Sequence, residues 1–82
     1  MHEILLGSET DGALFERLSE AIHLLHGTIS DAEWVLGGSQ EITKYKIVLP
    51  SGVLEAVAET YIGLTLRGSR ELVEALAGKV KA

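Results

Sequence analysis

The sequence predicts one α+β domain in which two helices pack on one face of a four-stranded, mainly antiparallel sheet, in the order β-α-β-β-β-α. Three observations predict this fold. Two stretches place apolar residues three and four positions apart, which is typical of helices, and others alternate between apolar and polar residues, which is typical of strands with one buried face. The length of 82 residues suits a single domain, residues 1–82.

The first expected strand covers residues 4–7, and an amphipathic helix is expected over residues 14–25. Thr10 or Asp11 can cap this helix by accepting hydrogen bonds from the free backbone N–H groups of its first turn. Gly27 is expected to supply the left-handed residue that ends it. A helix that links the first strand to the second predicts that these two strands run in the same direction.

Three further strands are expected over residues 32–36, 42–49 and 53–67, separated by turns that contain glycine or proline. Short turns predict that these strands form an antiparallel meander. In the third stretch the even positions are apolar and several odd positions are polar, so a period of two is favoured over a helical period. Residues 54–59 alone would also suit a helical turn.

The last helix is expected to begin at Ser69, a good N-cap, and to end at Gly78. Glu71 and Glu74 near its start, with lysines near its end, match the charge preference of the helix dipole. The residues expected to form the core are Ile4, Leu6, Leu14, Leu18, Ile22, Leu25, Trp34, Leu36, Tyr45, Ile47, Leu49, Ile62, Leu64, Leu66, Leu72 and Leu76.

Helices on one face of a sheet leave its other face to solvent or to a partner. The apolar side chains expected on that face are Val35, Ile42, Val48, Val57 and Tyr61. An apolar patch of several hundred Å² usually marks an interface, although β-branched residues also suit an exposed strand. We therefore expect a non-catalytic module that uses this face to form a homodimer or to bind another protein.

A second hypothesis concerns the turn that contains Arg67, Ser69 and Arg70, where a strand enters a helix. Free N–H groups, the helix dipole and two guanidinium groups could together hold a phosphate or a carboxylate. The alternative is an N-cap flanked by solvated arginines, which is a common arrangement. The sequence leaves both interpretations of this turn open.

Catalytic, metal and cofactor sites are not expected. Glu20, His23 and His26 are spaced by three residues on one helix, but a tetrahedral metal site needs more ligands than these. Ser8 and Asp11 are residue types used in nucleophilic catalysis, yet no pattern brings them together with a histidine. An enzyme is therefore the less favoured interpretation.

Composition indicates the expected surroundings of the chain. It contains no cysteine, so no disulfide can form, and a cytoplasmic location is expected. The net charge of −5 disfavours nucleic acids and anionic membranes as partners. The apolar run at residues 4–6 is too short for a signal peptide or a membrane span.

From the first helix onward, the expected order of helix, three strands and helix resembles the double-stranded RNA-binding domain. Gly68, Ser69 and Arg70 match the small-residue turn at which the last helix of that family begins. The resemblance implies an RNA contact made by a lysine cluster at this turn. Glu71 and Glu74 stand where those basic residues would be needed, so we interpret the resemblance as shared topology without RNA binding.

Overall fold

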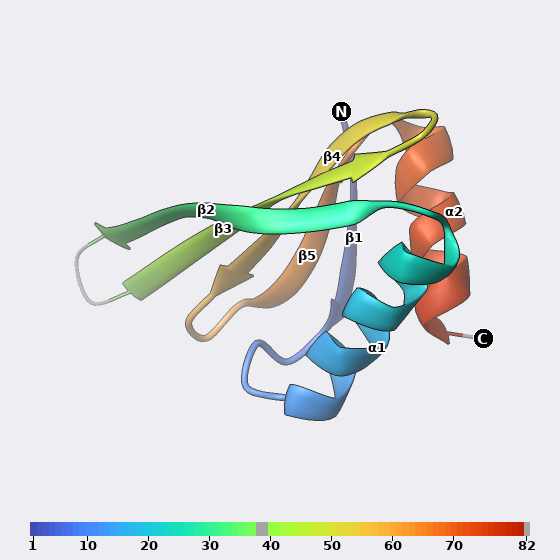
Figure 1. Cartoon of the computed structure of the whole chain (residues 1–82). Coiled ribbons are helices and arrows are strands. Elements are labelled where there is room, and N and C mark those ends of the chain that lie inside the picture. Colours follow the sequence, from blue (N-terminus) through green and yellow to red (C-terminus); the bar gives the residue numbers. More distant parts are fainter. Residues whose placement is uncertain (38–39, 82) are drawn as a thin grey trace.

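The computed structural model describes the backbone of residues 1–37 and 40–81 and the side chains of residues 1–30 and 41–81. Within this part of the chain, two helices and five strands follow one another in the order β-α-β-β-β-β-α (Figure 1). The elements are β1 (His2–Gly7), α1 (Gly12–Leu24), β2 (Thr28–Gly37), β3 (Gln40–Leu49), β4 (Gly52–Glu59), β5 (Gly63–Gly68) and α2 (Arg70–Lys81).

The five strands form one sheet in the order β1-β5-β4-β3-β2, and every neighbouring pair is antiparallel. The strand β4 therefore lies at the centre, and β1 and β2 lie at the two edges. Four antiparallel steps separate the edges, so β1 and β2 run in the same direction, as expected from the helix between them. The chain thus starts at one edge of the sheet and crosses to the other through α1 (Figure 1).

The stretch at residues 53–67 forms two strands, so the expected four-stranded sheet is wrong by one strand. The chain turns at residues 60–62, and β5 returns along β4 with Ala58 opposite Leu64. Because the turn has three residues, even-numbered residues of β4 and of β5 point to the same face. The apolar and polar alternation therefore continues through the turn, and the sequence pattern does not reveal it. Ile62, expected in the core, lies in this turn and is 52% exposed. Four strands separate the helices, which departs from the order of the double-stranded RNA-binding domain.

Both helices pack on one face of the sheet, as expected (Figure 1). Apolar side chains of α1 and α2 meet the helix-facing side chains of β3, β4 and β5, which removes apolar surface from water. The buried core consists of Leu14, Leu18, Ala21, Ile22, Ile47, Leu49, Leu54, Ala56, Leu64, Leu66, Val73, Leu76, Ala77 and Val80.

Much of the expected core is confirmed. Some residues that were expected in the core are only partly buried but pack against it. These are Ile4, Leu6, Leu25, Tyr45 and Leu72. The side chains of Trp34 and Leu36 lie outside the described residues. Backbone pairing places Trp34 opposite Thr43, just beyond an irregularity in the register of β2 with β3.

The two helices begin with the expected capping residues. The N-cap of α1 is Asp11, whose Oδ1 accepts a hydrogen bond from the Leu14 N–H at 3.2 Å. At the start of α2, Ser69 Oγ accepts from the Leu72 N–H at 3.4 Å. Each side chain satisfies a backbone donor that has no partner within its helix.

The ends of the helices differ from the expectation. The left-handed residue after α1 is His26, with φ of 60°, and not Gly27. The Gly27 N–H donates to the Ile22 carbonyl at 2.9 Å and so closes the helix end. In α2, Gly78 does not end the helix, which continues to Lys81.

Candidate interaction surface

We call the side of the sheet that faces away from the helices the open face. Strand alternation and register decide which residues lie on it, because neighbours along a strand point to opposite sides. The described residues of the open face are Glu3 and Leu5 on β1, Thr65 and Arg67 on β5, Val53, Glu55, Val57 and Glu59 on β4, Ile42, Lys44, Lys46 and Val48 on β3, and Thr28 and Ser30 on β2.

Four charged residues of alternating sign cross the open face in one line, which we call the charged row. Glu3 lies opposite Arg67, Arg67 lies opposite Glu55, and Glu55 lies opposite Lys46. Directly opposed residues on neighbouring strands are close enough for their side chains to interact. The charged row therefore runs negative, positive, negative, positive across β1, β5, β4 and β3.

Arg67 holds two carboxylates of the charged row. Its Nε donates to Glu3 Oε1, and its Nη1 lies 3.8 Å from Glu55 Oε1. The hydrogen bond that Arg67 donates to Glu3 and the negative charge of Glu3 raise the pKa of the Arg67 guanidinium, with smaller contributions from the charges of Glu55 and Glu59. These side chains are 35–51% exposed, so the pairs orient the groups more than they stabilise the fold.

The described side chains of the open face are electrically neutral as a set, unlike the chain as a whole. They include three glutamates, two lysines and one arginine, so their formal charge is zero. The whole chain has a net charge of −5, so the excess negative charge belongs to its other residues. A neutral face is the part of an acidic molecule that can approach a second acidic molecule at the least electrostatic cost.

The expected apolar patch is only partly present. Val48 and Val53 are 40% and 54% exposed and lie opposite each other on β3 and β4. Val57 is only 2% exposed, so it cannot supply contact surface. Ile42 is half-buried, and Tyr61 is 84% exposed but lies in the turn between β4 and β5.

The side chain of Val35 lies outside the described residues. Leu5, which is 57% exposed on β1, adds an apolar group that the expected patch did not include. Ile4 and Leu6 were expected in the core and pack against it, so the alternation along β1 leaves Leu5 on the other side. Exposed apolar groups of the open face thus lie on both sides of the charged row.

Charged residues that β1 and β5 bring to the open face were also missed. The pairing of Glu3 with Arg67 joins residues near opposite ends of the chain, and only the pairing of β1 with β5 creates it. A local sequence pattern carries no signal for such a pair. Strand order is the information that would have found it.

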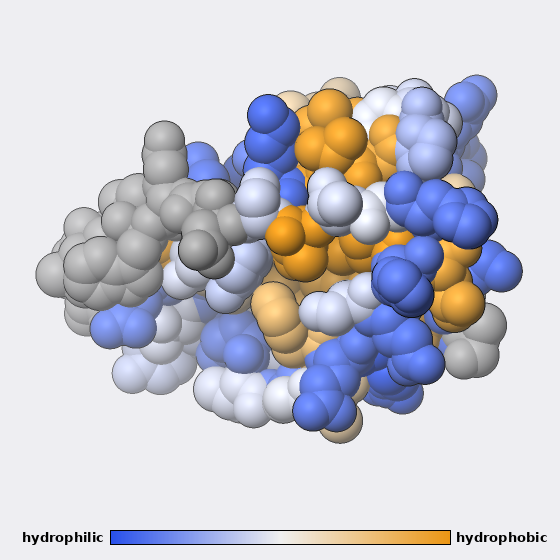
Figure 2. All heavy atoms as spheres, in the orientation of Figure 1, coloured by the Kyte–Doolittle hydropathy of each residue, from blue (hydrophilic) through white to orange (hydrophobic). Residues whose placement is uncertain are grey.

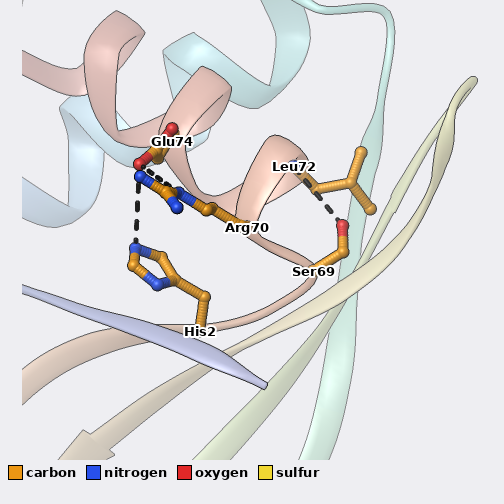
Figure 3. A network of polar contacts seen from close by, with 5 residues as sticks. All are labelled: His2, Ser69, Arg70, Leu72 and Glu74. Atoms are coloured by element: carbon orange, nitrogen blue, oxygen red, sulfur yellow. Dashed lines mark hydrogen bonds and ion pairs between the residues drawn. The ribbon is translucent and has the colours of Figure 1, made fainter.

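The turn considered for anion binding does not gather its two arginines at one point. Arg67 lies in the charged row, whereas Arg70 Nε donates to Glu74 Oε1 at 3.1 Å. His2 Nε2 lies 4.0 Å from the same Glu74 oxygen (Figure 3). Ser69 accepts the N-cap hydrogen bond described above. Carboxylates of the chain itself therefore occupy the positions that an anion would take beside both guanidinium groups.

Residue types considered for catalysis or metal binding have local contacts. Ser8 Oγ and Thr10 Oγ1 are 2.8 Å apart in the turn before α1. Exposed His23 and His26 lie at the end of α1. Within the described residues, no group of three histidines or carboxylates could hold a metal ion. In the same part of the chain, neither helix has the length and apolar character needed to cross a membrane.

Within the described part of the chain, two pockets lie on the helix side of the molecule. One, of about 410 Å³, is lined by Leu25, Leu49, Pro50, Ser51, Ser69, Glu71, Leu72 and Ala75. The other, of about 310 Å³, is lined by Arg17, Glu20, Ala21, Leu24, Lys79 and Val80. Figure 2 shows apolar surface gathered over the body of the molecule, with polar surface along its right and lower borders. Both pockets are separate from the open face.

Comparison with known proteins provides no family assignment. No family model matches the sequence, and no curated protein or solved structure matches it either.

Proposed function

We propose that this chain is a protein-interaction module that binds another polypeptide through the open face. The observation that carries the proposal is the face of the sheet that the helices leave uncovered, whose described side chains have a formal charge of zero in a chain with a net charge of −5. Antiparallel sheets can leave one face in water, but exposed apolar residues on that face favour a partner. Among its described side chains, Leu5, Val48 and Val53 are exposed apolar residues.

The residues of the open face suit a contact surface of mixed character. Interfaces of this kind combine an apolar centre with polar groups that remain hydrogen-bonded, and their charges mainly select the partner and its orientation. The ion pairs of Arg67 keep two carboxylates in defined positions before any partner arrives. Preorganised groups lose less conformational entropy on binding, so this arrangement favours recognition.

A photo-crosslinking side chain at Thr65, near the centre of the open face, tests the proposal in cells that express the chain naturally. The matched position is Glu16, an exposed residue of α1. We expect crosslinks to one defined protein from position 65 and not from position 16. The captured protein is then purified, and its affinity for the chain is measured.

The affinity measurement uses two matched variants. Leu5 on the open face and Leu24 on α1 are 57% and 60% exposed. We expect Leu5→Lys to weaken binding about tenfold or more, because it places a charge within the contact, and Leu24→Lys to leave it within about twofold. Equal affinities for both variants, or no crosslink from position 65, would contradict the proposal.

A further inference from the structure

We infer that the partner of the open face is a second copy of this chain, packed face to face about a two-fold axis that runs along the strands between β4 and β5. The inference rests on the proposed function and adds the identity and orientation of the partner. Its basis is the symmetry of the charged row. Two-fold dimers bring the same surface of each copy together, so the surface must complement itself.

An axis along the strands exchanges β4 with β5 and β1 with β3 across the interface. Glu3 then faces Lys46 of the second copy, and Arg67 faces Glu55 of the second copy. Each contact occurs twice by symmetry. An even number of charges with alternating sign is what makes every member of the row meet its opposite. A row of three or five alternating charges would place at least one charge against itself.

An axis perpendicular to the strands gives the opposite result. If it passes along the charged row, each residue meets its own counterpart, and Arg67 faces Arg67. Like charges at an interface cost several kcal/mol, so the row disfavours this orientation. Both axes leave the strands of the two sheets aligned within about 30°, as stacked sheets prefer, so the charges decide between them.

The residues beside the axis permit close approach of the two sheets. Thr65 and Val57 lie opposite each other on β5 and β4, two residues along each strand from the charged row. Both side chains are small, and that of Val57 is only 2% exposed, so it does not project from the face. Small central side chains suit the spacing of about 10 Å that stacked sheets adopt. Leu5 faces Lys44 of the second copy, whose aliphatic stem can cover it.

The overall charge of the chain also favours this face for self-association. Two copies carry a net charge of −5 each and repel one another at long range. The described side chains of the open face contribute no net charge. Contact through this face brings together neutral, complementary surfaces and leaves the excess negative charge on the outer sides of the dimer.

Charge reversal in trans tests the arrangement. Arg67→Glu places a glutamate opposite Glu55 of the second copy, and Glu55→Arg places an arginine opposite Arg67. We expect each variant alone to dimerise at least tenfold more weakly than the wild type, as measured by light scattering from about 10 µM to about 1 mM. An equimolar mixture of the two variants restores opposite charges at both symmetry-related contacts, so we expect it to dimerise about as well as the wild type.

The mixture separates the interface from effects within one chain. Both substitutions also alter the contact between Arg67 and Glu55 inside each copy. Mixing cannot repair that contact, because each chain keeps its own substitution. Restoration by mixing therefore reports contact between chains, and melting temperatures of the separate variants show that each remains folded.

Two outcomes would overturn the inference without deciding the proposed function. A wild-type chain that stays monomeric at every concentration would exclude a second copy as the partner, and the crosslinking at position 65 would still test the open face. The second outcome is a wild-type dimer that Leu5→Lys weakens, while the mixture of charge-reversed variants does not dimerise. It would mean that self-association uses the open face with a different axis.

Discussion

The sequence pattern predicted that Gly27 would be the left-handed residue at the end of α1. His26 takes the left-handed conformation, with φ of 60°. Gly27 is small because the chain approaches β3 at this point: a Cβ there would lie 2.7 Å from the Val48 carbonyl oxygen and would overlap Leu49 Cδ2. The requirement at position 27 is thus one of space.

We expect Gly27→Ala to lower the free energy of unfolding by about 1–3 kcal/mol, the usual cost of overpacking. The matched control is Gly78→Ala, because a Cβ at Gly78 meets no atom within 4 Å and this glycine lies inside α2. Alanine is the better helix former, so the control is expected to raise the free energy of unfolding by about 0.5–1 kcal/mol. Urea denaturation of both variants provides the measurement. Similar effects of the two substitutions would contradict the close approach at Gly27.

At the scale of the elements, the helix layer covers only part of the sheet. The hairpin of β2 and β3 extends beyond both helices (Figure 1). Within β3, Ile47 is fully buried under the helices, whereas Thr43, which lies on the same face and next to Ile42 in the chain, is only half-buried. Both residues lie between the same two neighbouring strands. One end of β3 therefore packs against the core, whereas the other end is held mainly by backbone hydrogen bonds to the neighbouring strands.

We expect the amide hydrogen of Ile42 to exchange with solvent at least about tenfold faster than that of Ile47, because local opening is easier where fewer apolar contacts must break. Hydrogen exchange followed by NMR at neutral pH, corrected for intrinsic rates, makes the comparison within one strand. Leu66 on β5 is fully buried and serves as the control, with protection close to that of Ile47. Equal protection at Ile42 and Ile47 would show that the sheet opens as one unit.

At the scale of the whole molecule, the distribution of charge matters more than its sum. The described side chains of the open face have a formal charge of zero in a chain of net charge −5. Two copies in contact have centres about 24 Å apart if each is taken as a body twice as wide as its radius of gyration of 11.8 Å. That distance is shorter than the Debye length of about 30 Å at 10 mM salt and longer than that of about 8 Å at 150 mM.

Self-association through the open face is therefore expected to become about tenfold tighter when salt rises from about 10 mM to about 150 mM. Salt screens the long-range repulsion between two acidic chains, whereas the close contacts of the charged row are screened much less. Sedimentation equilibrium at both salt concentrations gives the dissociation constants, and sucrose in place of salt controls for osmotic effects. Weaker association at higher salt would indicate an interface formed between oppositely charged regions.

The sequence by itself determined the α+β class, the two helices and the helix-facing side of β3 and β4, because these depend on the spacing of apolar residues along short stretches. Alternation in β3 and β4 placed Lys46 and Glu55 on the side away from the helices. It could not reveal the turn at residues 60–62, since a three-residue turn preserves that alternation.

Only the tertiary structure decided which strands are neighbours. Pairing of β1 with β5 brings Glu3 to Arg67 and completes the charged row, although 64 positions separate these residues along the chain. Val57, expected on an exposed patch, lies between Lys44 and Thr65 of the neighbouring strands and is only 2% exposed. Local periodicity reports the environment of each residue, whereas strand order is decided by the combined packing of the whole sheet against both helices.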